Sequence, residues 1–280
     1  MGYKNILVHL DDDPRQAERI ELAFGLAERF AAHLVGLHAP AVENLIPAVP
    51  GAPVPMAAIA SVEQHRQERE AAARRRFDAA ARRHPDIVGE WRGSAGLEVE
   101  ETCLSARFAD LIIVGQYEPE GAPGGMSPSF AEDLVLESGR PVLIIPYAGK
   151  FGEVGKRVMV AWDGSREAAR AVSDALPLLR KAENVSVAIF GADKFNLRHG
   201  EQPGADIAAF LARHGINVEV AQQQSESEGI GEQMLSRTMD FLADLVVMGG
   251  YGHSRFRESI FGGVTKTILK SMTVPVLMSH

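Results

Sequence analysis

The chain has 280 residues, 46% of them hydrophobic and 24% charged, and a formal net charge of -8. This composition predicts a soluble globular protein, and no apolar run approaches the roughly 20 residues that a membrane span needs. The acidic N-terminal segment does not have the pattern of a signal peptide, and the single cysteine, Cys103, cannot form an intramolecular disulfide. We therefore expect a cytoplasmic protein, and the length suits two domains of about 140 residues each.

Neither half of the chain is basic. Residues 1–150 hold 15 Lys and Arg against 22 Asp and Glu, and the remainder holds 14 against 15. A surface that binds nucleic acid usually needs clustered positive charge. The one candidate is an arginine-rich run at residues 74–83, where interspersed acidic residues favour a solvated helix face. We expect neither nucleic acid nor a membrane among the partners.

In chain order, the first half begins with an apolar strand at residues 4–8 that runs on to Asp11, Asp12 and Asp13. Three carboxylates could hold a cation, but a turn at the end of the strand and the start of a helix explain them better. His9 and His38 lie at strand positions, and we expect hydrogen-bonded core or cleft residues rather than metal ligands.

A proline-rich segment at residues 40–55 follows the second strand and is predicted to be a loop. The helical segment at residues 98–108 contains Cys103, which we expect to be a small buried side chain rather than a nucleophile. Apolar strands are predicted at residues 109–115 and 141–146. Both are continuous runs of Ile, Leu and Val.

The second half predicts alternating strands and helices, the first helix having Ser165 as its N-cap. The predicted strands lie at residues 157–162, 184–191, 217–222, 243–249 and 275–279. The predicted helices lie at residues 165–182, 205–215, 231–241 and 264–272.

The two halves repeat one another. ADLIIVGQ at residues 109–116 reappears as ADLVVMGG at residues 243–250, and PVLIIP at 141–146 as PVLMSH at 275–280, both at an offset of 134 residues. The first strands match at an offset of 152 residues, and the proline-rich segment accounts for the difference. Apolar runs without alternation indicate strands covered on both faces. The sequence therefore predicts an α/β protein of two tandem, doubly wound, Rossmann-like domains with five-stranded parallel sheets, at residues 1–149 and 155–280.

A glycine-rich segment follows the fourth strand of the second copy. In open parallel sheets, ligands bind beyond the carboxyl ends of the strands where the strand order reverses. Glycines at 249, 252, 262 and 263 could bring backbone N–H groups close to an anion, and the following helix adds unpaired N–H groups. This arrangement suits a polyphosphate, although the same glycines could serve only to form a long turn.

This segment resembles the ATP-binding loop of the universal stress protein family, G-x2-G-x9-G followed by Ser or Thr. The element order and the ADLVVMG and PVLM segments extend the resemblance to both copies. The resemblance implies that Gly249, Gly252, Gly262 and Gly263 hold phosphates and ribose. It further implies that Asp163 faces the adenosine, with Ala161 and Met248 beside it. His253 and Val264 complete the candidate site, although His253 could equally be a solvated loop residue.

The sequence departs from the family pattern in two places. Gly263 stands where the family has Ser or Thr, which removes a hydroxyl but keeps the backbone N–H. In the first copy, Glu118 and Glu120 stand where a phosphate would need donors, and neighbouring prolines remove N–H groups. We therefore expect one nucleotide per chain, bound by the second copy.

The resemblance implies a non-catalytic stress regulator that binds ATP or another adenine nucleotide, alone or with Mg²⁺, and hydrolyses it slowly at most. A nucleotide-independent scaffold that acts through protein partners remains the alternative. Family members commonly dimerise through the last strand, so the two copies should pack together as a pseudo-dimer within the chain, and a homodimer of chains is compatible with this arrangement.

Overall fold

A computed structural model describes residues 2–13, 15–39, 56–94, 96–120, 126–190, 204–223, 229–251 and 262–280. The proline-rich segment predicted at residues 40–55 lies outside the described residues. The first copy alternates strands and helices in the predicted order. Its elements are β1 (Asn5–Leu10), α1 (Gln16–Phe30), β2 (His33–His38), α2 (Met56–Ala81), β3 (Gly89–Gly93), α3 (Glu98–Ala106), β4 (Leu111–Gly115), α4 (Phe130–Glu137) and β5 (Val142–Ile145).

The second copy has the same alternation of elements. They are β6 (Arg157–Ala161), α5 (Arg166–Leu179), β7 (Asn184–Phe190), α7 (Ala205–Arg213), β8 (Val218–Gln223), α8 (Ile230–Asp240), β9 (Leu245–Gly249), α9 (Gly262–Ser271) and β10 (Val276–Ser279). Ser165 is the N-cap of α5, as predicted: its side chain accepts a hydrogen bond from the backbone N–H of Ala168.

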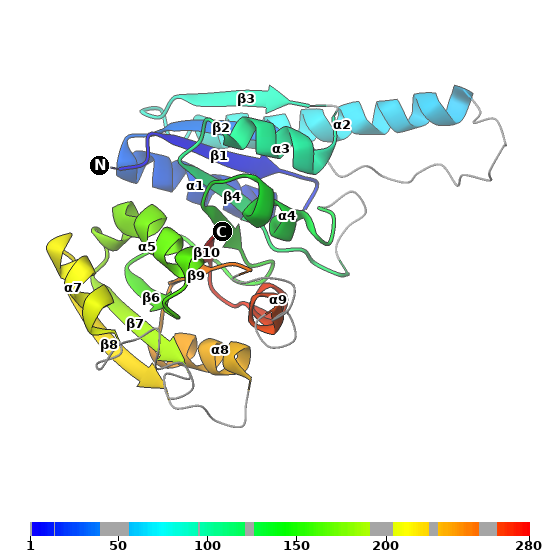
Figure 1. Cartoon of the computed structure of the whole chain (residues 1–280). Coiled ribbons are helices and arrows are strands. Elements are labelled where there is room, and N and C mark those ends of the chain that lie inside the picture. Colours follow the sequence, from blue (N-terminus) through cyan, green and yellow to red (C-terminus); the bar gives the residue numbers. More distant parts are fainter. Residues whose placement is uncertain are drawn as a thin grey trace.

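All ten strands form one sheet, in the order β3-β2-β1-β4-β5-β10-β9-β6-β7-β8 (Figure 1). Within each copy every neighbouring pair of strands is parallel. In each copy the chain starts in the middle strand, winds outward to one side and returns to wind to the other. This is the doubly wound topology, and its switch points lie between β1 and β4 and between β6 and β9.

The two copies meet at the antiparallel pair of β5 and β10. Leu143 lies opposite Leu277, and these two residues occupy the same position of the 134-residue repeat. Val142 and Ile144 pair with Met278 and Val276 on either side. This is the symmetric pairing that two identical strands make about a two-fold axis, so the expected pseudo-dimer forms inside one chain.

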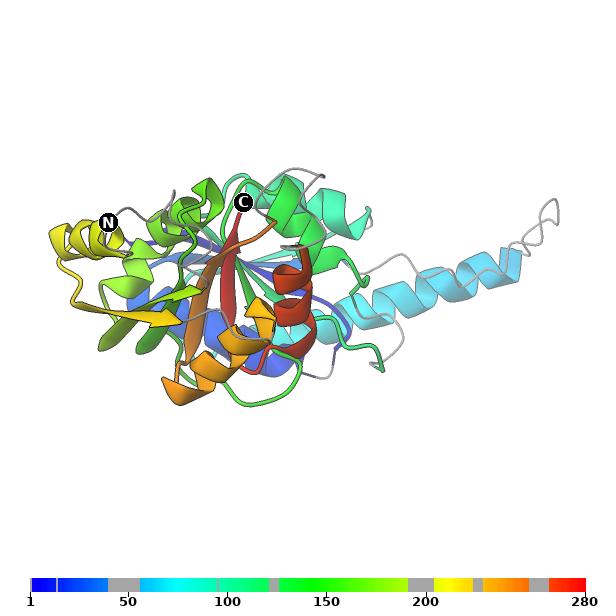
Figure 2. The ribbon, with the colours of Figure 1, turned by 60° about the horizontal axis from the view of Figure 1, so that its bottom comes forward.

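The sheet is covered on both faces, and each face has a core that spans both copies. One core contains side chains of α1, α2, α5 and α7, and the other contains side chains of α3, α4, α8 and α9. Figure 2 shows the helices on both sides of the twisted sheet. The continuous apolar strands of the sequence follow from this double coverage, because both sides of each central strand are buried.

The long helix α2 docks on β2 through its C-terminal half and extends beyond the sheet at its other end (Figures 1 and 2). The docking residue is Phe77, which is fully buried against Gly36 of β2. A Cβ on Gly36 would lie 2.5 Å from the Phe77 ring, so the absence of a side chain lets the helix approach. The arginine-rich run lies on this helix, and Arg74 pairs with Asp78 at 3.8 Å, as expected for a solvated helix face.

Among the described helices, none combines the length and the apolar character that a membrane-crossing helix needs.

Candidate functional site

The candidate site of the second copy lies at the switch point between β6 and β9. These strands are parallel neighbours, with Val160 opposite Val247, so their carboxyl ends meet at one edge of the sheet. The chain leaves β6 through Ala161 and Asp163 and leaves β9 through Met248 and Gly249. The structure therefore brings these four predicted residues to the same edge.

Asp163 forms a tight turn after β6. Its carboxylate oxygen Oδ1 accepts a hydrogen bond of 2.9 Å from the backbone N–H of Ser165. The side chain stays partly exposed, and no cation of the described segments lies within ion-pair distance of its carboxylate. Asp163 thus has the strand-end role considered from the sequence, and its side chain stays partly exposed at this edge of the sheet.

Gly249 is required by close packing. A Cβ at this position would lie 2.6 Å from the backbone nitrogen of Ala168, because the start of α5 rests directly on the end of β9. Met248 is buried in the core beneath the crevice, where Ala161 packs as a partly buried residue. Close packing against α5 therefore explains the glycine at position 249, whether or not it also approaches a phosphate.

The next two residues connect the candidate loop to the first copy and to α9. A Cβ on Gly250 would lie 2.8 Å from Val135 of α4. Tyr251 has a left-handed backbone with φ of 53°, and its N–H donates to the hydroxyl of Thr265 at 3.4 Å. Thr265 was not predicted from the sequence, and it fixes the start of the loop to the first turn of α9.

Helix α9 begins at Gly262, and Gly263 lies in its first turn. Among the described residues, nothing lies within 4 Å of a Cβ built on Gly263, and its φ is not in the left-handed region. Val264 is partly buried and packs on the core. The predicted site residues Gly252 and His253 lie outside the described residues.

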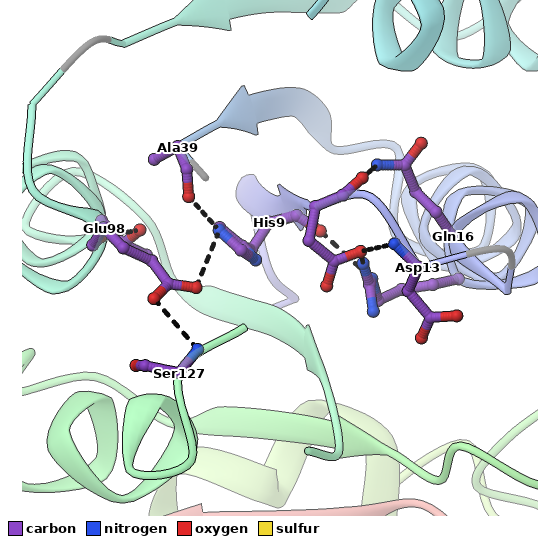
Figure 3. Close-up of polar contacts among 9 residues, drawn as sticks. His9, Asp13, Gln16, Ala39, Glu98 and Ser127 are labelled. Atoms are coloured by element: carbon purple, nitrogen blue, oxygen red, sulfur yellow. Dashed lines mark hydrogen bonds and ion pairs between the residues drawn. The ribbon is translucent and has the colours of Figure 1, made fainter. Parts of the chain in front are cut away.

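The matching edge of the first copy is closed by its own side chains (Figure 3). Asp11, which corresponds to Asp163, is fully buried and pairs with Arg19 at 2.7 Å. Burial, the largest single effect, would raise the pKa of Asp11, but the Arg19 guanidinium, His9 and the backbone N–H of Asp13 together hold that pKa below its usual value. Asp11 also accepts the backbone N–H of Asp13 at 3.0 Å, so the expected strand-end turn is present.

The described residues contain no group of three His, Cys, Asp or Glu side chains that could hold a metal ion. Cys103 is buried, and burial raises the pKa of its thiol to about 11. It is therefore protonated at neutral pH, as expected for a packing residue.

His9 and Glu98 extend the buried polar cluster of the first copy. The Nε2–H of His9 donates to the carbonyl of Ala39 at 2.8 Å and lies 4.0 Å from Glu98 Oε1. Glu98 Oε2 accepts the backbone N–H of Ser127 at 3.2 Å (Figure 3). Burial raises the pKa of Glu98 to about 7 and lowers that of His9 to about 4. Glu98 was not among the predicted residues, and its neighbours lie on β1 and in the segment before α4.

His9 and His38 lie in the core, as expected, but their ring nitrogens are not all hydrogen-bonded. Both His9 and His38 are buried strand residues, and burial also lowers the pKa of His38 to about 4. Within the described ranges, however, neither ring nitrogen of His38 and only one of His9 has a hydrogen-bond partner. Both rings are therefore neutral at pH 7 and held mainly by packing, such as the contact of His9 with Phe130 at 4.4 Å between ring centroids.

Gln116, also not predicted, links the two copies. It occupies the position of Gly250 in the repeat, and its side-chain amide donates to the carbonyl of Leu269 in α9 at 2.7 Å. Leu269 corresponds in the repeat to Val135, which packs at Gly250. Equivalent positions of the repeat therefore join the copies twice. Gln116 and Leu269 are joined by a hydrogen bond, and Gly250 and Val135 by apolar packing.

Two doubly wound domains with a shared sheet define a tandem α/β protein whose candidate sites lie at the strand-order reversals. The chain belongs to the Universal stress protein family, which matches residues 2–146 and 155–280. The match covers both copies, so the resemblance predicted from the loop and the repeat is confirmed.

Two of the solved structures that match share the fold along the whole chain, and a third matches about half of it. A universal stress protein from Archaeoglobus fulgidus DSM 4304 has a TM-score of 0.70 at 18% identity, covering 98% of this chain and 95% of that chain. A functionally unknown protein from Pseudomonas aeruginosa PAO1 has a TM-score of 0.55 at 14% identity, covering 99% and 92%. A universal stress protein in complex with cAMP has a TM-score of 0.35 at 19% identity, covering 53% and 100%. No curated protein sequence matches the chain.

Proposed function

We propose that this protein is a non-catalytic stress-response regulator that binds ATP or another adenine nucleotide in its second copy. The observation that carries the proposal is the partial exposure of the Asp163 side chain. It lies at the switch-point edge with a partly exposed carboxylate, whereas its counterpart Asp11 is buried and paired with Arg19. A ligand that enters such an edge finds a hydrogen-bond acceptor available in the second copy alone.

The space beside Gly263 that is free of other described residues also supports nucleotide binding. Helix α9 begins at the candidate loop, and no side chain of the described chain approaches Gly263. Backbone N–H groups in the first turn of a helix lack intrahelical partners and favour anions. A polyphosphate at this helix start would have an adenosine group within reach of the neighbouring β6 edge.

A nucleotide-independent scaffold is the second candidate, and the packing at Gly249 and Gly250 favours it. Both glycines are explained by contacts with α5 and α4, so they would be needed even in a protein without a nucleotide. In that case the chain would act in the stress response through protein partners.

Titration of the full chain with ATP, in the presence and absence of Mg²⁺, distinguishes the two functions. We expect one nucleotide per chain, and Asp163→Ala should weaken its affinity at least about tenfold, the equivalent of about 1.4 kcal/mol. Glu183→Ala is the matched control, because Glu183 is an exposed acid at the opposite end of the second copy's strands. Absence of binding at millimolar ATP would favour the scaffold.

A further inference from the structure

The first copy carries a buried guanidinium at its switch-point edge. Arg19 is 3% exposed, and its Nη2 donates to Asp11 Oδ1 at 2.7 Å. Its Nε donates to the backbone carbonyl of His9 at 3.1 Å. The Arg19 side chain therefore donates hydrogen bonds both to the Asp11 carboxylate and to the His9 backbone carbonyl at the end of β1.

Gly115 makes room for this guanidinium. A Cβ on Gly115, at the end of β4, would collide with Arg19 Nη1. Arg19 thus spans the switch point from β1 to β4. In the second copy the corresponding glycine, Gly249, is instead met by the backbone of α5.

The repeat identifies two exchanges between the copies. Arg19 corresponds to Ala171, and His9 corresponds to Ala161. Ala171 is fully buried and has no group that could reach Asp163. Two long polar side chains in the first copy therefore stand where the second copy has two methyl groups.

We propose that Arg19, assisted by His9, is an internal ligand that closes the first copy, and that these two side chains exclude a nucleotide from its switch-point edge in addition to the changed loop. The guanidinium gives Asp11 the hydrogen bond that a bound molecule would otherwise supply. Displacing Arg19 would leave a buried carboxylate unpaired, which is strongly unfavourable. The site assignment rests on the proposed function, but the closure of the first copy does not.

Cysteine alkylation tests the closure without a nucleotide. In a Cys103→Ser background, His9→Cys and Ala161→Cys place a thiol at matching positions, and iodoacetamide measures their access. We expect Ala161→Cys to react at least about tenfold faster. Adding Arg19→Ala should accelerate the reaction of His9→Cys, and adding Ala171→Arg should slow that of Ala161→Cys. Equal rates for the two thiols, with no response to Arg19→Ala, would overturn the proposal.

ATP titration tests the consequence for binding. Ala171→Arg should lower the affinity of the second copy at least about tenfold, and Ala171→Met, which adds similar bulk without a charge, should lower it less. Circular dichroism confirms that each variant is folded; where Ala171→Arg does not fold, the Arg19→Ala alkylation arm decides. Undiminished ATP binding by folded Ala171→Arg would contradict the proposal. A wild-type chain that binds no ATP but shows the expected alkylation rates would refute the proposed function and leave the closure standing.

Discussion

Glu98 is a buried carboxyl group whose Oε2 accepts a hydrogen bond from the backbone N–H of Ser127, while its Oε1 lies 4.0 Å from His9 Nε2. Burial raises its pKa from 4.5 to about 7 in the folded chain, so the folded state binds the proton more tightly than the unfolded state. The stabilisation from this proton is complete below about pH 4.5 and is lost as the pH rises to about 7.

Glu98→Gln keeps the side chain neutral at every pH. The free energy of unfolding of this variant should exceed that of the wild type by about 1–3 kcal/mol at pH 8 and should approach it near pH 4.5. Urea unfolding at the two pH values measures the difference. Glu100→Gln, an exposed change on the same helix, should show no such pH dependence. A constant difference for Glu98→Gln would mean that this carboxyl group titrates normally.

Gly263 permits a test of the missing hydroxyl at the family's Ser or Thr position. Because a Cβ at Gly263 meets no atom of the described residues within 4 Å and the φ is not in the left-handed region, both Gly263→Ser and Gly263→Ala should fold without strain. Both remove a glycine from the first turn of α9, so they differ mainly in the hydroxyl. We expect Gly263→Ser to bind ATP about tenfold more tightly than Gly263→Ala, since a hydrogen bond to a charged group contributes about 1.5–3 kcal/mol. Equal affinities in calorimetry would place the phosphates elsewhere.

Residue-scale features differ in how far the sequence predicts them. Ser165 was found as an N-cap because that role depends on local chain geometry alone. Arg19 was missed because its partners lie on another element, and helical periodicity does not reveal which buried position holds a charge. The exchange of Arg19 for Ala171 within the repeat was the available signal. Gln116 was missed for the same reason, since its acceptor belongs to the other copy.

At the scale of elements, the docking of α2 on β2 depends on one glycine. Phe77 packs over Gly36 and is held on its other sides by Phe24 and Trp91, with ring centroids at 5.3 and 5.9 Å. The ring therefore has little freedom to move away from an added methyl group.

Gly36→Ala should destabilise the chain by about 1–3 kcal/mol through overpacking. Gly25→Ala is the matched control. Gly25 lies within α1, no atom of the described part of the chain is within 4 Å of a Cβ built there, and the change should stabilise the chain by about 0.5–1 kcal/mol. Denaturant unfolding of the two variants checks the opposite signs. An unchanged free energy of unfolding for Gly36→Ala would show that α2 can shift on the sheet to make room for the methyl group.

Most elements could be predicted because their signals are local or repeated. The strands at residues 245–249 and 276–279 stand out as apolar runs, and their likeness to residues 111–115 and 142–145 aligned the two copies. The packing of the two copies through β5 and β10 was expected only through the family resemblance, and the antiparallel direction of the pair was not predicted, because no pattern within a strand identifies its neighbour. Gly252 and His253 remain predictions from the sequence.

At the scale of the whole molecule, the central pairing has the symmetry of a dimer interface. Leu143 and Leu277 face each other at equivalent positions, so β10 should be able to pair with a second β10 in the same way. In the full chain β5 occupies that edge.

The isolated second copy, residues 155–280, should therefore form a dimer, because removal of β5 exposes the apolar edge of β10. Light scattering coupled to size-exclusion chromatography measures the mass. The full chain under the same conditions provides the reference for a sheet whose central edge is already paired. A monomeric, folded second copy would show that β10 does not need a partner strand.

The covalent joining of the two copies has a consequence for how the sites can change. In a dimer of identical chains, every mutation enters both sites at once, so a guanidinium that blocks one would block the other. Here β5 and β10 belong to the same chain, and a substitution at position 19 leaves position 171 as it was. Because the repeats are fused, the two copies can evolve different residues at equivalent positions. One copy can acquire an arginine that occupies its switch-point edge while the other keeps an alanine there.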